Sequence, residues 1–274
     1  MRIRATVAAL SGTLALSALA VPAAQAADGP SSAPRIAAKA AKGANVGDTK
    51  ITKVTVNGGK NVAVGTTNKV KFSVAVTATD PSGVARGSAF LYHGDLDTAD
   101  GVLVPDDFDG KCKVVNATTS TCTVTVTVDP KGDLYNVLAG SGWKVYATAG
   151  ANDEDMAQNE AYKSDAKFQR NARLTTNASP EPIKKGKTLT VTGALTRANW
   201  DTLKYAGYTK QSVKLQYKKK GASSYSTLKT ITSDSKGNLK TTVKASADGY
   251  YRYVFAGTST TPAVTSTSDF VDVQ

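Results

Sequence analysis

The chain has 274 residues, of which 20% are charged, and it contains one histidine and two cysteines. Its formal net charge of +12 is uneven: residues 27–170 carry 16 Lys and Arg against 16 Asp and Glu, whereas residues 171–274 carry 16 against 6. Because histidine is the commonest catalytic base and metal ligand, this composition argues against histidine-dependent catalysis and thiolate metal sites. We expect no enzyme.

The first 26 residues have the organisation of a secretory signal peptide. A basic start at residues 1–4 precedes an apolar run at residues 5–21, and small residues lead to Ala26. This order predicts cleavage after Ala26. A membrane anchor fits less well, because the run is rich in Ala and Ser and is followed by the processing site. The sequence therefore predicts a secreted, extracellular protein with no membrane span.

Residues 27–47 are predicted to be a flexible leader, because they combine turn formers and small residues without a bulky apolar period. Beyond Lys50 apolar and polar residues alternate, as in residues 70–78, 122–128 and 143–149, and only residues 134–138 indicate a helical turn. The alternation resumes after Arg170, in residues 188–192, 213–217, 239–243 and 251–255. Short alternating segments between turn residues predict an all-β protein with two tandem immunoglobulin-like sandwiches, residues 48–170 and 171–274.

The two cysteines are predicted to form a disulfide across a hairpin. If residues 116–118 are the turn, Val115 faces Thr119 and Cys112 lies opposite Cys122. Both cysteines share side-chain parity with Val114 and Val124, which places the bridge on the core face. An exported protein meets oxidising conditions, so a structural bridge is favoured over a redox centre.

Two groups of acidic residues are candidate calcium sites. The first runs from Asp95 to Asp109, but its aspartates and glycines do not follow the spacing of an EF-hand loop. The second combines Asp80 with Asp153, Glu154 and Asp155, because the loops at one end of a sandwich lie together. The alternative for both is a solvated acidic loop. Calcium is therefore the one cofactor that the sequence suggests.

The basic half carries a candidate binding stripe. Lys214, Lys218 and Lys220 share parity opposite to the apolar residues of their segment, and Arg252 faces away from its tyrosine neighbours. Such a stripe would attract an anionic cell-envelope polymer or an acidic carbohydrate, with a steep dependence on salt. The alternative is that the lysines protect sheet edges and keep the domain soluble. No motif that reads nucleic acid accompanies the charge, so no specific nucleic-acid partner is expected.

Residues 197–208 interrupt the alternating segments with three aromatic side chains, Trp200, Tyr205 and Tyr208. Aromatic rings on a long loop can stack on a sugar ring. They can also cap the open end of a hydrophobic core, and we favour this second interpretation.

Several of these segments resemble known extracellular families. Residues 77–84, residues 145–149 followed by Asn152 and Asp153, and the two cysteines make residues 48–170 similar to an Ig-like family of secreted Streptomyces proteins. Residues 232–239 and 249–257 resemble another actinobacterial Ig-like module. The resemblance implies architecture and supplies no catalytic residue to transfer.

These observations favour a secreted, non-enzymatic interaction or adhesion module that acts through its loops and basic face. A calcium-binding structural extracellular protein is the alternative. A carboxylate-dependent hydrolase is more distant, because small Ig-like domains seldom form the deep cleft that such chemistry needs. The single histidine, His93, is expected to have a packing or surface role.

Overall fold

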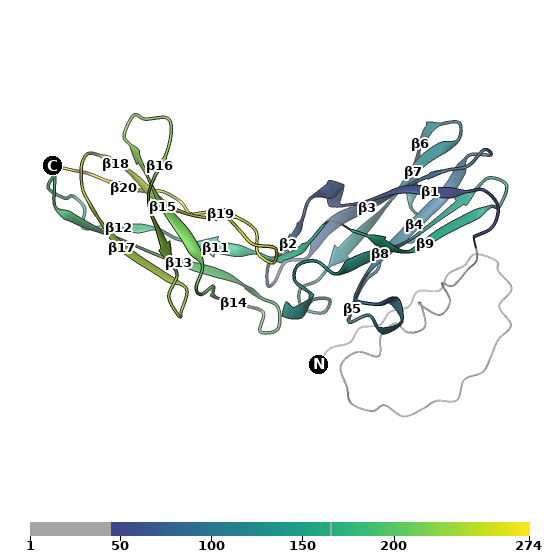
Figure 1. Ribbon diagram of the computed structural model, residues 1–274, viewed down its shortest axis with the longest axis horizontal. Coiled ribbons are helices and arrows are strands. Elements are labelled where there is room, and N and C mark those ends of the chain that lie inside the picture. Colours follow the sequence, from purple (N-terminus) through teal and green to yellow (C-terminus); the bar gives the residue numbers. More distant parts are fainter. Residues whose placement is uncertain (1–44, 165) are drawn as a thin grey trace, which may run out of the picture.

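The computed structural model describes residues 45–164 and 166–274, which form two β-sandwiches arranged end to end (Figure 1). The predicted signal peptide and most of the predicted leader, through residue 44, lie outside the described residues. In the part of the chain that the structure describes, no helix has the length and hydropathy that crossing a membrane requires.

The first sandwich packs two antiparallel sheets. One has the strand order β1 (Lys50–Val56), β3 (Val70–Thr79), β7 (Thr119–Val128) and β6 (Lys111–Asn116). The other has the order β5 (Gly101–Leu103), β4 (Val84–His93), β8 (Trp143–Ala151) and β9 (Met156–Lys163). Short strands β2 (Val62–Val64) and β10 (Phe168–Arg170) pair in parallel, and the short 3-10 turns are η1 (Asn57–Gly59), η2 (Leu96–Thr98) and η3 (Asn136–Leu138). When the strands of these two sheets are lettered A, B, C, C′, D, E, F and G in chain order, the sheets read ABED and C′CFG. This is the immunoglobulin arrangement, and it confirms the predicted fold.

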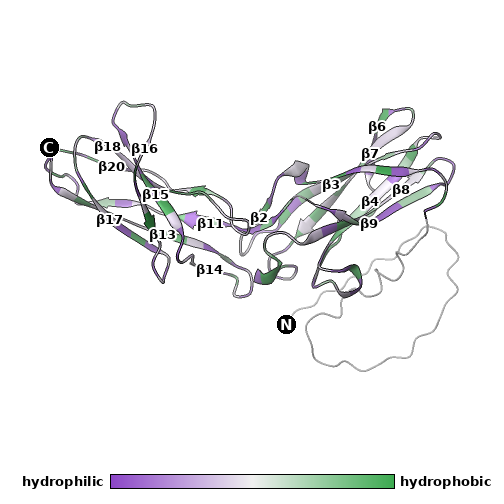
Figure 2. Ribbon diagram, in the orientation of Figure 1, coloured by the Kyte–Doolittle hydropathy of each residue, from purple (hydrophilic) through white to green (hydrophobic). Residues whose placement is uncertain are grey.

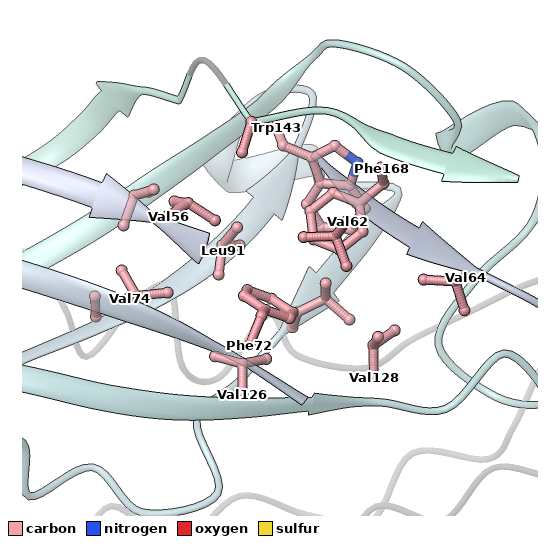
Figure 3. Packing of buried hydrophobic residues seen from close by; sticks show 14 of the residues in the cluster. Val56, Val62, Val64, Phe72, Val74, Leu91, Val126, Val128, Trp143 and Phe168 are labelled. Atoms are coloured by element: carbon pink, nitrogen blue, oxygen red, sulfur yellow. The ribbon is translucent and has the colours of Figure 1, made fainter. Parts of the chain in front are cut away.

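The core of this sandwich follows from the alternation in the sequence. Along β3 and β7 every second residue is buried, and Phe72, Val74 and Val126 meet side chains of the facing sheet. Figure 3 shows these residues around Trp143 and Phe168, whose ring centroids are 4.6 Å apart. Figure 2 shows hydrophilic and hydrophobic residues on the same strands, as the period of two requires.

The second sandwich packs two five-stranded sheets. In the first sheet β13 (Thr188–Asn199) pairs with β11 (Ala172–Leu174) and β12 (Asn177–Ser179) on one side, and with β14 (Lys204–Gly207) and β17 (Asn238–Lys244) on the other. The facing sheet has the order β16 (Ser226–Thr232), β15 (Ser212–Lys219) and β18 (Gly249–Phe255). Strand β18 also pairs with the short strands β19 (Val264–Thr265) and β20 (Asp269–Val271). The core includes Leu189, Val191, Leu215 and Tyr253, all fully buried.

The disulfide between Cys112 and Cys122 is present, and the two residues are directly paired between β6 and β7. The observed turn is shorter than the predicted one, because Asn116 and not Val115 faces Thr119. A bulge between Val114 and Asn116 restores the predicted pairing of the cysteines. Cys122 is buried against Gly87 of the facing sheet, where a Cβ atom would lie 2.8 Å from the Cβ of Cys122. Val114 does not share the core face, since it is 69% exposed at the sheet edge.

The predicted leader extends too far, because its last residues belong to the first sandwich. The backbone groups of Val46 and Met156 exchange two hydrogen bonds of 2.9 Å. Asn45 Oδ1 also accepts a 2.7 Å hydrogen bond from the backbone N–H of Gln158. These contacts lie along the edge of β9 that does not pair with β8. They involve mainly backbone groups, so they leave no apolar pattern in the sequence from which they could be predicted.

The joint between the sandwiches is built around Trp200, at the end of β13. Its indole is 2% exposed and belongs to the hydrophobic cluster of the first sandwich, although its strand belongs to the second. Indole Nε1 donates to the carbonyl oxygens of Val64 and Gly65, at 3.2 and 3.1 Å. The first core is therefore completed by a side chain from the second domain.

Polar contacts surround this tryptophan. The guanidinium of Arg170 is buried and donates from Nε to the carbonyl of Ala198 at 2.6 Å. Burial and then the nearby charge of Arg197 lower the pKa of Arg170 to about 10. On the other side Asn136 Oδ1 accepts from the backbone N–H of Trp200 at 3.0 Å, and Asn136 N donates to Asp201 Oδ1 at 3.0 Å.

Candidate functional sites

The end of the first sandwich remote from the joint gathers three carboxylates. Asp48 precedes β1, Asp80 follows β3, and Asp155 lies in the turn between β8 and β9. One oxygen of each lies within 4.8 Å of the other two. Within residues 45–164 and 166–274 this is the one group of three or more His, Cys, Asp or Glu side chains so placed.

Hydrogen bonds hold two members of this triad, Asp80 and Asp155, in position. Asp80 is 2% exposed and accepts from Thr49 Oγ1 at 2.6 Å, Ser82 Oγ at 2.6 Å and Ser82 N at 2.8 Å. These donors, Ser82 Oγ above all, hold the pKa of Asp80 below its usual value. Asp155 Oδ2 accepts from the backbone N–H of Asp48 at 2.9 Å. Gly47 has φ +75°, and a Cβ there would overlap the Asp155 carboxylate, so this position requires glycine.

The third carboxylate, Asp48, has the least favourable electrostatic environment of the three. Its pKa is raised by desolvation and by the negative charges of Asp80, Asp155 and Asp153. The predicted calcium set combined Asp80 with Asp153, Glu154 and Asp155. The structure brings Asp80 and Asp155 together with Asp48 as the third member, whereas Glu154 and Asp153 lie outside the group; Asp153 is near enough to repel Asp48. Three converging carboxylate oxygens are chemically suited to a hard cation such as Ca²⁺.

The other acidic segment, Asp95 to Asp109, does not converge. Asp95 pairs with Lys144 at 3.2 Å, Asp100 with His93 Nδ1 at 2.6 Å, and Asp106 with Lys71 at 3.7 Å. Because these three carboxylates have partners on three different strands, they form separate contacts and no common site. The ring of His93 packs against Trp143 with centroids 5.5 Å apart, and its Nε2 contacts the Ser141 carbonyl at 3.3 Å.

The solvent side of the second sandwich carries alternating cations and rings on β15, β18 and β20. We define the cation–aromatic face as Lys214, Lys218, Arg252, Tyr225, Tyr250 and Phe270. The β15–β18 register pairs Lys214 with Val254, Gln216 with Arg252, and Lys218 with Tyr250. Phe270 of β20 lies beside Tyr250. Three of the predicted binding residues therefore share one sheet face with three rings.

Tyr225 organises this face. Its ring lies over the Arg252 guanidinium, with 3.6 Å from Cζ to the ring centroid, and 5.1 Å from Lys218 Nζ. Lys218 Nζ is also 5.1 Å from the Tyr250 centroid. The Tyr225 hydroxyl is 2.6 Å from Ser268 Oγ across the sheet, and Arg252 Nε donates to Gln216 Oε1 at 3.0 Å. Both cations thus lie against rings, and Arg252 is also held by the amide of Gln216.

Lys214, Lys218 and Arg252 have no carboxylate partner among the described residues. Lys220, the fourth predicted residue, differs: it lies 5.5 Å from the Phe270 centroid and pairs with Asp248 at 3.4 Å. Together with Lys185 and Lys219, Lys220 lines an open hollow of about 420 Å³ at the end of the sandwich. The face therefore offers positive charge that the protein itself does not neutralise.

Residues 197–208 were predicted to interrupt the strands, but they form the hairpin between β13 and β14, and its three aromatic residues are turned inward. Trp200 is buried in the joint, so no sugar can stack on its ring. Tyr205 is covered by the guanidinium of Arg173 at 3.7 Å, and Tyr208 by that of Arg197 at 4.0 Å. Tyr208 also packs against Phe255 of the second core, with centroids 5.7 Å apart. The rings of this segment cap hydrophobic cores, whereas Tyr225, which sequence reasoning missed, is a partly exposed ring on the cation–aromatic face.

No protein-family model and no curated protein matches the chain. Solved structures that are similar include latent PorU from Porphyromonas gingivalis (10% identity, TM-score 0.29, 82% of this chain and 20% of that one). Others are fibronectin(III)-like modules of Clostridium thermocellum CbhA (12%, 0.29, 81% and 93%) and a marsupial T cell receptor (12%, 0.40, 81% and 72%). The assignment of the fold rests on the strand order described above.

Proposed function

We propose that the protein is a secreted, extracellular interaction module without catalytic activity, which binds an anionic cell-envelope polymer or acidic carbohydrate through the cation–aromatic face. The observation that supports this proposal is the placement of Lys218 and Arg252 on tyrosine rings with no carboxylate partner in the described chain. Preorganised cations lose less side-chain entropy when they bind an anion than free lysines do.

The rings add a second element of recognition. Tyr225, Tyr250 and Phe270 are each partly exposed, so a sugar unit has apolar surface to cover between the charges. Lys214 extends the positive charge along β15, away from Lys218. An extended polymer with repeated phosphate or carboxylate groups matches such a line of cations, because a strand spaces side chains of one face by about 6.6 Å.

The test compares full-length variants in sedimentation with a purified phosphate-containing wall polymer over a salt series. Replacing Lys214, Lys218 and Arg252 by Gln should flatten the slope of log K against log salt by roughly two to three, one counterion per lost contact. The matched control replaces the exposed lysines 184, 204 and 236 by Gln, which changes the charge of the same domain equally. If both triple variants weaken binding to the same extent, general charge and not this face binds the polymer.

We also propose that the triad of Asp48, Asp80 and Asp155 binds calcium and thereby stabilises the first sandwich. A cation would relieve the repulsion that raises the pKa of Asp48. Binding to the folded state stabilises by mass action, so the midpoint of thermal unfolding should rise with millimolar calcium. Asp48→Asn with Asp155→Asn should remove the rise, whereas Asp97→Asn with Asp107→Asn should preserve it. An unchanged midpoint in the wild-type protein would refute this proposal.

A further inference from the structure

Strand β17 has a free edge that its counterpart in the first sandwich does not have. In the first sandwich β7 pairs with β3 on one side and with β6 on the other. In the second sandwich the five residues 233–237 connect β16 directly to β17, and β17 pairs only with β13 among the described residues. One strand position, which β6 fills in the first domain, is thus open in the second.

Hydrogen bonds show which groups of β17 face this open side. The Thr242 carbonyl accepts from Lys229 Nζ of β16 at 2.6 Å, so it points away from β13. Asn238 bonds in the same direction, since its N–H donates to Asp234 Oδ1 at 2.8 Å. Backbone groups alternate sides along an antiparallel strand. The N–H and C=O groups of Lys240, Thr242 and Lys244 therefore face outward.

The space next to this edge is hollow and basic. An open groove of about 470 Å³ lies between β16 and β17, lined by Thr188, Leu228, Lys229, Thr242, Val243 and Lys244. Leu228 is 42% exposed and provides apolar surface. The lysines at positions 229, 240 and 244 have no carboxylate partner in the described chain. Backbone, apolar surface and positive charge thus converge on one side of the sandwich.

We propose that the β17 edge binds an extended acidic peptide segment of another protein, which adds as a further strand beside β17. The peptide backbone would pair with the outward groups of Lys240, Thr242 and Lys244. Alternate side chains would face the groove at Leu228 and Val243, and the intervening carboxylates would lie opposite Lys240 and Lys244 on the solvent side.

The contact of Lys229 with the edge accounts for the requirement for acid. A neutral strand must displace the ammonium from the Thr242 carbonyl without giving it a new partner, which is costly. An acidic strand offers the same ammonium a carboxylate. The lysine therefore discriminates against strands without carboxylates, including the basic β17 edge of another copy of this chain.

The experiment measures binding of fluorescent octapeptides to the full-length protein by polarisation. A peptide that alternates Val and Glu should bind, and one that alternates Val and Lys should not. N-methylation of alternate residues, in two complementary peptides, separates pairing from charge: one set should weaken binding by about tenfold or more, and the other should be tolerated. Equal binding by both N-methylated peptides would overturn the proposal, because attraction by charge alone is indifferent to the backbone.

Variants locate the site. Thr242→Pro removes an outward N–H that β13 does not use, and should abolish binding; Pro is tolerated at such edge positions. If this variant unfolds, Lys240→Glu with Lys244→Glu tests the same edge without altering the backbone, against Lys184→Glu with Lys236→Glu as control. The Gln triple variant at Lys214, Lys218 and Arg252 should bind the peptide normally. A loss confined to that variant would place the peptide on the cation–aromatic face and refute the strand addition.

Discussion

Replacing Trp200 by Ala should destabilise the domain to which it does not belong. The indole is buried in the first core and donates to Val64 and Gly65, so its removal leaves a cavity there. Removal of a buried Trp costs about 3–5 kcal/mol. For a domain of this size each kcal/mol lowers the unfolding midpoint by roughly 4 °C, so a decrease of roughly 12–20 °C is expected.

The chain provides its own probe for this measurement. It has two tryptophans, and the second, Trp143, lies in the core of the first sandwich. In the Trp200→Ala variant, tryptophan fluorescence therefore reports the first sandwich alone. Thermal and urea unfolding followed by this signal give the stability of that domain directly. The wild-type reference is followed by circular dichroism and fluorescence together, because two domains need not unfold in one step.

Tyr208→Ala is the matched control, since this ring comes from the same hairpin segment, directly after β14, but packs against Phe255 of the second core. It should lower the stability of the second sandwich and leave the transition of the first largely unchanged. If Trp200→Ala shifts the Trp143 transition by no more than the control does, the first core does not depend on the second domain. The reasoning about the joint would then be wrong.

Two further predictions concern the first sandwich. Replacing Cys112 and Cys122 by Ser should lower its stability by about 2–3 kcal/mol without unfolding the second domain, and urea denaturation of the variant and the wild-type protein measures this loss. Mass spectrometry of non-reduced wild-type peptides verifies the bridge itself. Ser82→Ala should raise the pKa of Asp80, whose lowered value in the folded state contributes stability above the unfolded pKa of 3.8 that is lost as pH falls below it. Urea titrations from pH 7 to pH 2 should therefore show the variant less stable at neutral pH and the difference disappearing in acid; a constant difference would contradict this assignment.

The predictable part of this molecule is the part governed by the period of two. Side-chain parity alone placed Lys214, Lys218 and Arg252 on a solvent face, and an assumed hairpin turn placed Cys112 opposite Cys122. The register of the cysteines came out correctly although the turn did not, because the bulge near Val115 compensates for the shorter turn. Asp80 and Asp155 meet because loops at one end of a sandwich are close for any sequence.

The missed residues lie outside such patterns. Asp48 follows a stretch without alternation, so nothing in the sequence connects it with Asp80. Tyr225 lies just before β16 in a turn, and its contact with Arg252 of β18 is a tertiary contact that no alternation in the sequence indicates. The sequence around Trp200 would look the same whether the indole entered its own core or that of the neighbouring domain. Only the packing of the two domains at the joint determines which core it enters.

The buried tryptophan at the joint also determines how the two ends of the molecule can act together. Two binding modules on a flexible linker raise each other's local concentration over a broad range of ligand separations. A joint closed by an indole, a buried guanidinium and an asparagine bridge holds the triad and the cation–aromatic face at a set separation and orientation. If both proposed sites bind, such a molecule gains avidity only from a partner whose binding groups have the matching separation.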